Sequence, residues 1–152
     1  MRQLLLRASR IVNRHVVEGL QARGYTGLRS THTTLLSNMP LAGGTVTETA
    51  ERAGISKQAM GRLAADLENA GYVRVIVDPA DARVRILELT EIGRRLMFDS
   101  LDVMADLENR YAKLIGSKTL RATLDGLEAF NNAADQIRPV APVDWRRAVS
   151  GA

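Results

Sequence analysis

The chain has 152 residues, of which 45% are hydrophobic, and this suffices for a globular domain with or without an added helical layer. Only 4% of the residues are aromatic, which argues against a protein that stacks unpaired bases on aromatic side chains. The absence of cysteine excludes disulfides, thiolate metal sites and thiol-based redox sensing. The formal net charge of +4 favours an anionic partner, although only residues 1–30 are strongly basic, with six arginines and one glutamate.

A helix is predicted over residues 4–23, with Gly24 as its stop. Its apolar residues recur at helical spacing, namely Leu4, Leu5, Ala8, Ile11, Val12, Val16 and Leu20. Arg7, Arg10 and Arg14 lie roughly opposite this apolar stripe. They form either a solvated face or a contact surface for DNA phosphates or an acidic partner.

A second, shorter helix is predicted from about residue 28 or 30 to Asn38. The Met39-Pro40 pair ends it, because proline displaces the residue before it from the α region. Residues 42–44, Ala-Gly-Gly, are then expected to be a flexible link.

A helix-turn-helix is predicted over residues 45–70. Small and apolar residues stand where two short helices must be pinned at a fixed angle, namely Ala50, Ala53, Gly54, Ile55, Met60 and Leu63. Thr45 and Glu48 form a capping box that fixes the start of the first helix. After the glycine turn, Ser56 can cap the second helix, and Gly71 is its left-handed stop.

The outward face of the second helix carries Ser56, Lys57, Gln58 and Arg62, which can hydrogen-bond base edges or phosphates. Glutamine suits adenine, and arginine suits guanine or phosphate. The alternatives are a purely capping role for Ser56 and ordinary surface polarity for the other three. Gly61 costs roughly 1 kcal/mol against alanine inside a helix. Either close approach to a DNA groove or tight packing of the helix explains this glycine.

A β-hairpin is predicted directly after this helix, from two β-branched runs over residues 72–77 and 84–89 around a Pro/Asp turn. A guanidinium at its tip, that of Arg83, can enter a narrow minor groove, where the potential is most negative. An ordinary Asp–Arg turn pair is the alternative. Arg74 and Arg85 either touch phosphates or solvate the outer face of the hairpin.

These residues resemble the MarR (multiple antibiotic resistance regulator) family of winged-helix transcription factors. Four motifs in one order carry the resemblance: Ser56-Lys-Gln-Ala-Met-Gly61, Leu67-Glu-Asn-Ala-Gly-Tyr-Val73, Asp78-Pro-Ala-Asp-Ala-Arg83 and Leu89-Thr-Glu-Ile-Gly-Arg94. The resemblance implies that the hairpin is a wing whose Arg83 enters the minor groove, and that Asp81 holds this arginine in place.

Two further helices are predicted, from a cap at Thr90 to about Ile115 and, after Gly116-Ser117, onward to Ile137. Their apolar stripes are larger than a small winged helix can cover, so a second copy of the chain is expected to cover them. The tail over residues 138–152 is expected to be extended or disordered, with Trp145 docked on the body or on the partner subunit.

The predicted fold is therefore mostly α with a small β-hairpin wing, a winged helix-turn-helix with a helical dimerisation layer. DNA binding is assigned to residues 45–90, dimerisation to residues 1–38 and 91–137, and residues 138–152 form a flexible tail. A homodimer would place its recognition helices about 34 Å apart, in successive major grooves of a pseudopalindromic operator in duplex DNA. In the family such a regulator is more often a repressor. The alternative is a winged-helix module for protein interaction or architecture, without small-molecule control.

The resemblance also implies a small, often aromatic or anionic effector, bound between the dimerisation helices and the winged helix. Arg29, His32 and His15 are the candidate contacts, each with a structural or surface role as the alternative. His15 and Glu18 have the i, i+3 spacing of half a metal site, but the chain lacks the ligands to complete it, so no metal or cofactor is expected. No catalytic constellation is present, and an enzyme is not expected.

The longest apolar runs fall far short of the roughly 20 residues that span a bilayer. The N-terminus lacks the apolar region of a signal peptide. We therefore expect a cytoplasmic protein with no membrane association.

Overall fold

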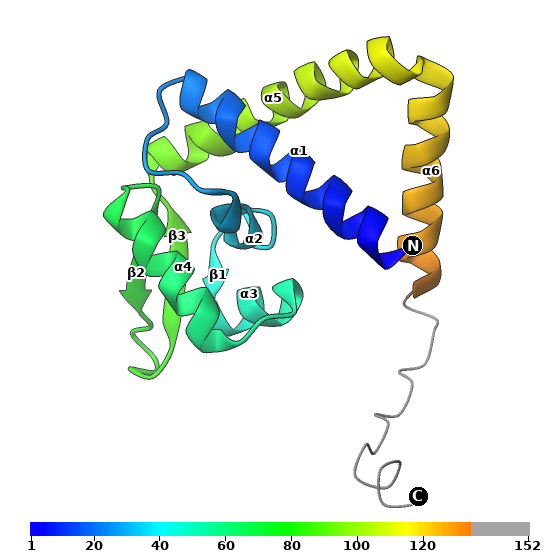
Figure 1. Ribbon diagram of the computed structural model, residues 1–152. Helices are drawn as coiled ribbons and strands as arrows, with labels where there is room; N and C mark the ends of the chain where they lie inside the picture. Colours follow the sequence, from blue (N-terminus) through cyan, green and yellow to red (C-terminus); the bar gives the residue numbers. More distant parts are fainter. Residues whose placement is uncertain (135–152) are drawn as a thin grey trace, which may run out of the picture. The chain divides into compact units, whose positions relative to one another are not determined.

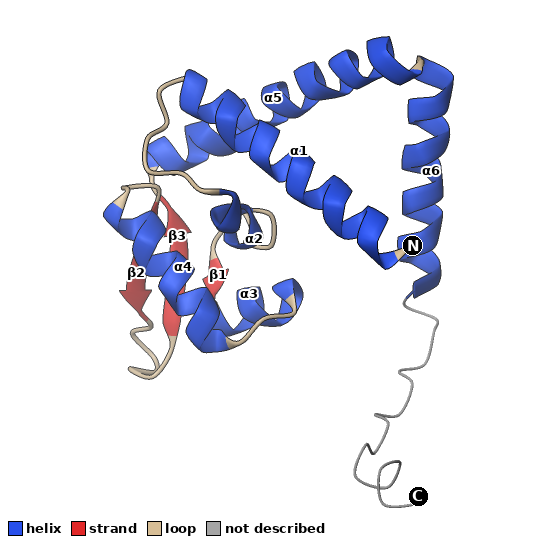
Figure 2. Cartoon of the chain, in the orientation of Figure 1, coloured by secondary structure: helices blue, strands red, loops and turns tan. Residues whose placement is uncertain are grey.

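The structure is a computed structural model that describes residues 1–134 (Figure 1). It divides after Asn109 into two compact units. The elements are α1 (Arg2–Ala22), the 3-10 helix η1 (Ser30–His32), α2 (Thr33–Leu36), β1 (Gly44–Thr45), α3 (Val46–Ala53), α4 (Lys57–Asn69), β2 (Val73–Val77), β3 (Arg85–Leu89), α5 (Glu91–Ile115) and α6 (Ser117–Ala134). The described chain is mostly helical with one small antiparallel sheet (Figure 2), which confirms the predicted fold class.

The sheet has the strand order β1-β3-β2, with both pairings antiparallel. The predicted hairpin is confirmed, with Val73 opposite Leu89 and Val77 opposite Arg85. The predicted flexible link is wrong in part, because Gly44 pairs with Leu87 in β1. A Cβ on the preceding Gly43, whose φ is 90°, would lie 2.8 Å from the Leu87 carbonyl oxygen. This close approach, which only glycine tolerates, joins the third strand to the hairpin.

The second predicted helix is shorter than expected and consists of two pieces, η1 and α2. Polar side chains after it bond back to its carbonyl groups, since Ser37 Oγ donates to Thr33 O at 2.5 Å and Asn38 Nδ2 donates to Thr34 O at 2.9 Å. Such local bonds compete with the continuation of a helix. The helix accordingly ends at Leu36, before the Met39-Pro40 pair that was predicted to end it.

The core of the first unit joins the helices to the sheet. Its fully buried side chains include Leu35 of α2, Met60 and Leu67 of α4, Leu87 of β3 and Leu96 of α5. One face of α1 also contributes Val16, Val17 and Leu20. Burial of a leucine, valine or methionine side chain is worth about 1.5–3 kcal/mol, so this cluster fixes the position of α4 beneath its exposed face.

The start of α5 is fixed to the end of α4 and to β2. Thr90 Oγ1 donates to Gly71 O at 2.7 Å and accepts the backbone N–H of Gly93 at 3.0 Å, which confirms Thr90 as the predicted cap. A Cβ on Gly93 would lie only 1.9 Å from the carbonyl oxygen of Tyr72. The first turn of α5 therefore packs against the backbone at the start of β2 without room for any side chain at this position.

Helix α6 has no buried residue among those described. Its exposed apolar side chains include Leu124, Leu127 and Phe130. Of the sequence predictions for the C-terminus, Ile137, Trp145 and the tail 138–152 lie outside the described residues.

Candidate nucleic-acid interface

Local capping bonds fix the two helices of the helix-turn-helix. The Thr45 hydroxyl accepts the N–H of Glu48 at 3.1 Å, and the Glu48 carboxylate accepts the N–H of Thr45 at 3.0 Å, so the predicted capping box is confirmed. These bonds lower the pKa of Glu48. Gly54 makes the turn with φ of 65° in the left-handed region. Ser56 caps α4 by accepting the N–H of Ala59 at 3.2 Å, which leaves its hydroxyl proton available to donate to a phosphate.

The exposed face of α4 carries Lys57, Gln58 and Arg62. None of these side chains has a hydrogen-bond or ion-pair partner among residues 1–134. On the opposite face Met60, Ala64 and Leu67 are buried, which holds the helix by one side only. The three polar side chains are thus presented to solvent as the sequence predicts, with two positive charges and one amide.

Gly61 lies on this helix in open space, with nothing within 4 Å of an added Cβ. Packing within the chain therefore does not require glycine here, which excludes the tight-packing alternative. Gly61 also lines a groove of about 270 Å³ between α4 and the sheet. Its charged lining residues are Lys57 and Glu68 from α4 and Arg85 from β3.

The hairpin tip is organised by carboxylates that accept backbone N–H groups. Asp78 Oδ1 accepts from Ala80 N at 2.8 Å, and Asp81 Oδ1 accepts from Arg83 N at 2.9 Å. Asp81 therefore positions the backbone of Arg83 rather than its guanidinium. The exposed Arg83 side chain has no polar partner among residues 1–134, so its charge is available at the tip.

The other two hairpin arginines are engaged within the hairpin. Arg74 forms an ion pair with Glu88 at 3.0 Å on the neighbouring strand. The Arg85 guanidinium donates to the carbonyl oxygens of Ala82 at 2.8 Å and Val84 at 3.3 Å. Both contacts support the hairpin's shape, and each engages one terminal nitrogen of its guanidinium, so donors remain on the other nitrogens for a phosphate.

A carboxylate of α4 ties the helix to the hairpin. Glu68 Oε1 accepts the backbone N–H of Val75 at 2.8 Å. Together with the buried contacts beneath α4, this bond fixes the hairpin relative to the exposed face that carries Arg62. A fixed spacing is what simultaneous contact with two adjoining grooves requires.

Arg29 and His32, two of the predicted effector contacts, instead face Asp66 of α4. The Arg29 guanidinium pairs with the Asp66 carboxylate, and His32 Nε2 lies 3.7 Å from the same carboxylate. His32 Nδ1 accepts the backbone N–H of Arg29 at 3.2 Å, and His32 Nε2 lies 3.2 Å from the Arg29 guanidinium. Burial lowers the pKa of His32, the charge of Arg29 acts in the same direction, and Asp66 opposes them.

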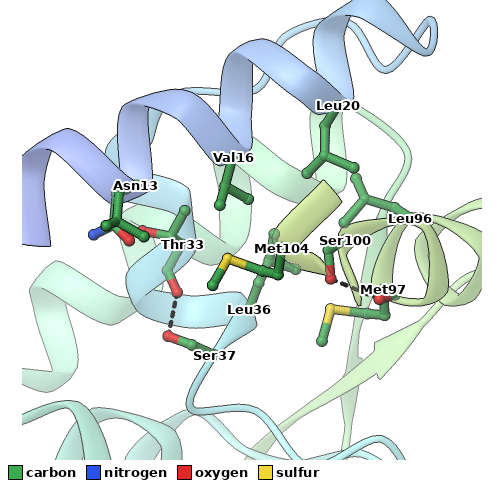
Figure 3. Close-up of a pocket in the computed structure, with 11 residues that line it drawn as sticks. Asn13, Val16, Leu20, Thr33, Leu36, Ser37, Leu96, Met97, Ser100 and Met104 are labelled. Carbon is green, nitrogen blue, oxygen red and sulfur yellow. Dashed lines mark hydrogen bonds between the residues drawn. The ribbon is translucent and has the colours of Figure 1, made fainter. Parts of the chain in front are cut away.

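A separate cavity of about 290 Å³ lies within the first unit, between α1, α2 and α5 (Figure 3). Its lining residues are Val12, Asn13, Val16, Leu20, Thr33, Leu36, Ser37, Leu96, Met97, Ser100 and Met104. None of the predicted effector contacts Arg29, His32 and His15 is among them. The sequence reasoning missed this cavity, because its lining comes from three elements whose proximity no local pattern reveals.

The described residues hold no group of three or more histidine, aspartate or glutamate side chains that could bind a metal ion. Within residues 1–134, no helix combines the length and the apolar character needed to cross a membrane.

A protein-family model described as the MarR family matches residues 26–84. An uncharacterised protein of Mycobacterium tuberculosis is 32% identical over 95 residues, 62% of this chain. The matched segment is 66% of that relative, just under two thirds of its length.

Solved structures match over most of the chain. The crystal structure of MarR has a TM-score of 0.71 at 20% identity, covering 89% of this chain and 95% of that one. The transcriptional repressor CouR, bound to a 23-mer DNA duplex, has a TM-score of 0.64 at 25% identity, covering 86% and 92%. The matched family and structures are regulators rather than enzymes, in agreement with the sequence expectation.

Proposed function

Because the chain belongs to the MarR family of winged-helix regulators, we propose that it is a homodimeric, sequence-specific repressor that binds duplex DNA and responds to a small molecule. Residues 45–90 read the DNA, and residues 1–38 and 91–137 supply the dimerisation layer. The recognition helix α4 enters the major groove, and Arg83 enters the adjoining minor groove.

The proposal rests on two polar surfaces without partners in the described chain, the exposed face of α4 and the tip of the hairpin that follows it. Lys57, Gln58 and Arg62 on α4 and Arg83 at the hairpin tip keep their polar groups free of contacts within residues 1–134. Arginine in a major groove suits guanine, and arginine in a narrow minor groove meets the most negative potential. The structure of CouR on a DNA duplex supports the same use of this fold here.

Fluorescence anisotropy with a pool of random duplexes, followed by selection of the bound sequences, tests DNA reading. Arg62→Ala should cost about 1–3 kcal/mol and relax specificity at one base position, if the guanidinium contacts a base. Arg83→Ala should weaken binding and reduce the slope of log K against log salt by about 0.9 for each phosphate that the variant no longer neutralises.

Arg121→Ala on α6 is the matched control, since it removes one exposed positive charge outside residues 45–90. If all three variants lost DNA affinity equally, the loss of one positive charge would explain the decrease, and contacts specific to a groove would be contradicted. A protein-interaction module would show no salt-dependent DNA binding in the first place.

Exposed apolar side chains support dimerisation. In the first unit they include Leu4, Phe98 and Leu101, and in the second unit Leu114, Leu124, Leu127 and Phe130. Large apolar side chains gathered on helices signal an interface in soluble proteins. Sedimentation equilibrium should give twice the chain mass, and Leu124→Glu with Leu127→Glu should give monomers that bind DNA weakly. A monomeric wild-type chain at micromolar concentration would contradict the homodimer.

The cavity between α1, α2 and α5 is the proposed effector site. Its lining comes from α1, α2 and α5, all within the residues assigned to dimerisation, and α2 also packs against α3 and α4 of the DNA-binding segment. A ligand that binds one arrangement of these helices more tightly than another would shift the protein toward that arrangement. Its effect on DNA affinity would be limited by the difference between its binding free energies for the two arrangements.

A further inference from the structure

The cavity between α1, α2 and α5 is lined without a single charged side chain. Seven of its residues are apolar, and the other four are neutral and polar, namely Asn13, Thr33, Ser37 and Ser100. Figure 3 shows Asn13, Thr33 and Ser37 toward one side of the cavity and Ser100 toward the other.

Each of the three hydroxyl groups in the lining donates its proton to a backbone carbonyl oxygen. Thr33 Oγ1 donates to Ser30 O at 2.7 Å, Ser37 Oγ donates to Thr33 O at 2.5 Å, and Ser100 Oγ donates to Met97 O at 2.6 Å. Their oxygen lone pairs remain as acceptors. The Asn13 amide, which has no polar partner among residues 1–134, is the one uncommitted donor of the lining.

A single amide donor, without a cation, does not suit the binding of an anion. A carboxylate that leaves water needs a cation or several donors, and without them its burial is prohibitively unfavourable. Arg29 and His32 do not line the cavity, and both have other contacts: Arg29 pairs with Asp66, and His32 is 1% exposed and bonded to Arg29. A neutral hydroxyl, in contrast, can donate to a serine or threonine oxygen, and a neutral carbonyl can accept from Asn13.

Building on the proposed function, we propose that the effector is an uncharged, largely apolar molecule with one polar group directed at Asn13, Thr33 or Ser37. The volume of about 290 Å³ is at the lower end of the range of about 300–1,000 Å³ for small-molecule sites, so a body of one or two rings fits. Valine, leucine and methionine side chains supply the apolar walls, and Met97 and Met104 can adapt to the ligand's outline. Of the aromatic or anionic effectors that the family resemblance implies, this lining favours the aromatic and neutral ones over the anionic ones.

Isothermal titration calorimetry of the full chain at pH 7.0 tests the charge of the ligand with matched probes. The pairs are 2-naphthol with 2-naphthoate, and 4-isopropylphenol with 4-isopropylbenzoate, which differ mainly in ionisation. The phenols should bind at least tenfold more tightly than the carboxylates. Equal or tighter binding of the carboxylates, or no binding of either phenol, would overturn the proposal.

Two substitutions place the binding in this cavity. Ser100→Leu adds bulk to the wall and should weaken phenol binding at least tenfold. Asn13→Arg adds a cation and should raise carboxylate affinity at least tenfold, whereas the same change on the exposed face of α6, Asn131→Arg, should not. If Ser100→Leu fails to fold, the comparison of carboxylate affinity between Asn13→Arg and Asn131→Arg decides whether the ligand binds in this cavity. Phenol binding that neither cavity substitution alters would overturn the assignment.

Arg29→Gln separates the competing anion site from the cavity. If carboxylates bind the wild-type chain and bind this variant more weakly, Arg29 is an anion contact and the present proposal is wrong. DNA anisotropy without ligand is measured alongside. An absence of DNA binding with intact phenol binding would refute the proposed function and leave the ligand class standing.

Discussion

Replacing Gly61 with alanine should make the protein more stable and a poorer DNA binder. An added Cβ meets nothing within 4 Å, so the methyl group introduces no clash within the chain. Alanine is favoured over glycine inside a helix by roughly 1 kcal/mol. For a chain of this size that gain corresponds to a rise in Tm of about 2–4 °C.

The same methyl group would stand on the face of α4 between Lys57 and Arg62, where DNA is proposed to approach. Overpacking a close contact costs about 1–3 kcal/mol, or roughly 5- to 150-fold in affinity. Urea denaturation and thermal unfolding measure the first effect, and anisotropy on a selected duplex measures the second.

Gly126→Ala is the matched control, because Gly126 is also in a helix, with nothing within 4 Å of an added Cβ. It should raise stability by a similar amount, and because Gly126 lies in the proposed dimerisation layer, its DNA affinity is compared only after sedimentation shows the wild-type mass. If Gly61→Ala bound DNA as tightly as the wild type, the idea that glycine admits the groove would be refuted. A decrease in stability would contradict the open surroundings of Gly61.

Three further predictions concern the contacts that support the site. Gly93→Ala should destabilise the chain by about 3 kcal/mol, because its Cβ would lie 1.9 Å from the Tyr72 carbonyl oxygen; an unchanged urea midpoint would contradict this packing. The lowered pKa of His32 stabilises the fold fully above its unfolded value of about 6.5 and loses this contribution as pH falls through the folded pKa. Stability should therefore decline below about pH 6.5, with a shallower decline in His32→Asn, and equal slopes would exclude His32 as the cause. Asp66→Asn should lower the pKa of His32 further in an NMR titration, since Asp66 favours the protonated ring, and a rise would show that the charge balance is misassigned.

Short-range signals made the frame of the helix-turn-helix predictable. Each capping side chain accepts a backbone N–H group three residues farther along the chain, so its role follows from spacing alone. These side chains are Thr45, Ser56 and Thr90. The hairpin followed from two β-branched runs around a turn.

Long-range contacts were not predictable from one sequence. The two-residue strand β1 exists only because β3 pairs with it, and its own residues, Gly44 and Thr45, carry no strand pattern. Arg29 and Asp66 are 37 positions apart, so no local pattern links them, and the sequence alone does not predict their ion pair. The contacts of Arg74 with Glu88 and of Arg85 with two carbonyl oxygens of the hairpin are likewise not predictable from the sequence, and the predicted phosphate contacts of both arginines remain predictions.

The contacts of Thr90 and Gly93 have a mechanical consequence for signalling. They tie the first turn of α5 to the residues just before β2, so a displacement of this turn is expected to carry the start of the hairpin with it. Under the proposed function, a displacement of α5 at the cavity, where Leu96 and Ser100 lie on the same helix, would therefore change the position of the hairpin that carries Arg83. If the proposed effector binds beside Ser100, its effect on DNA binding would then be read at a hairpin that it does not touch.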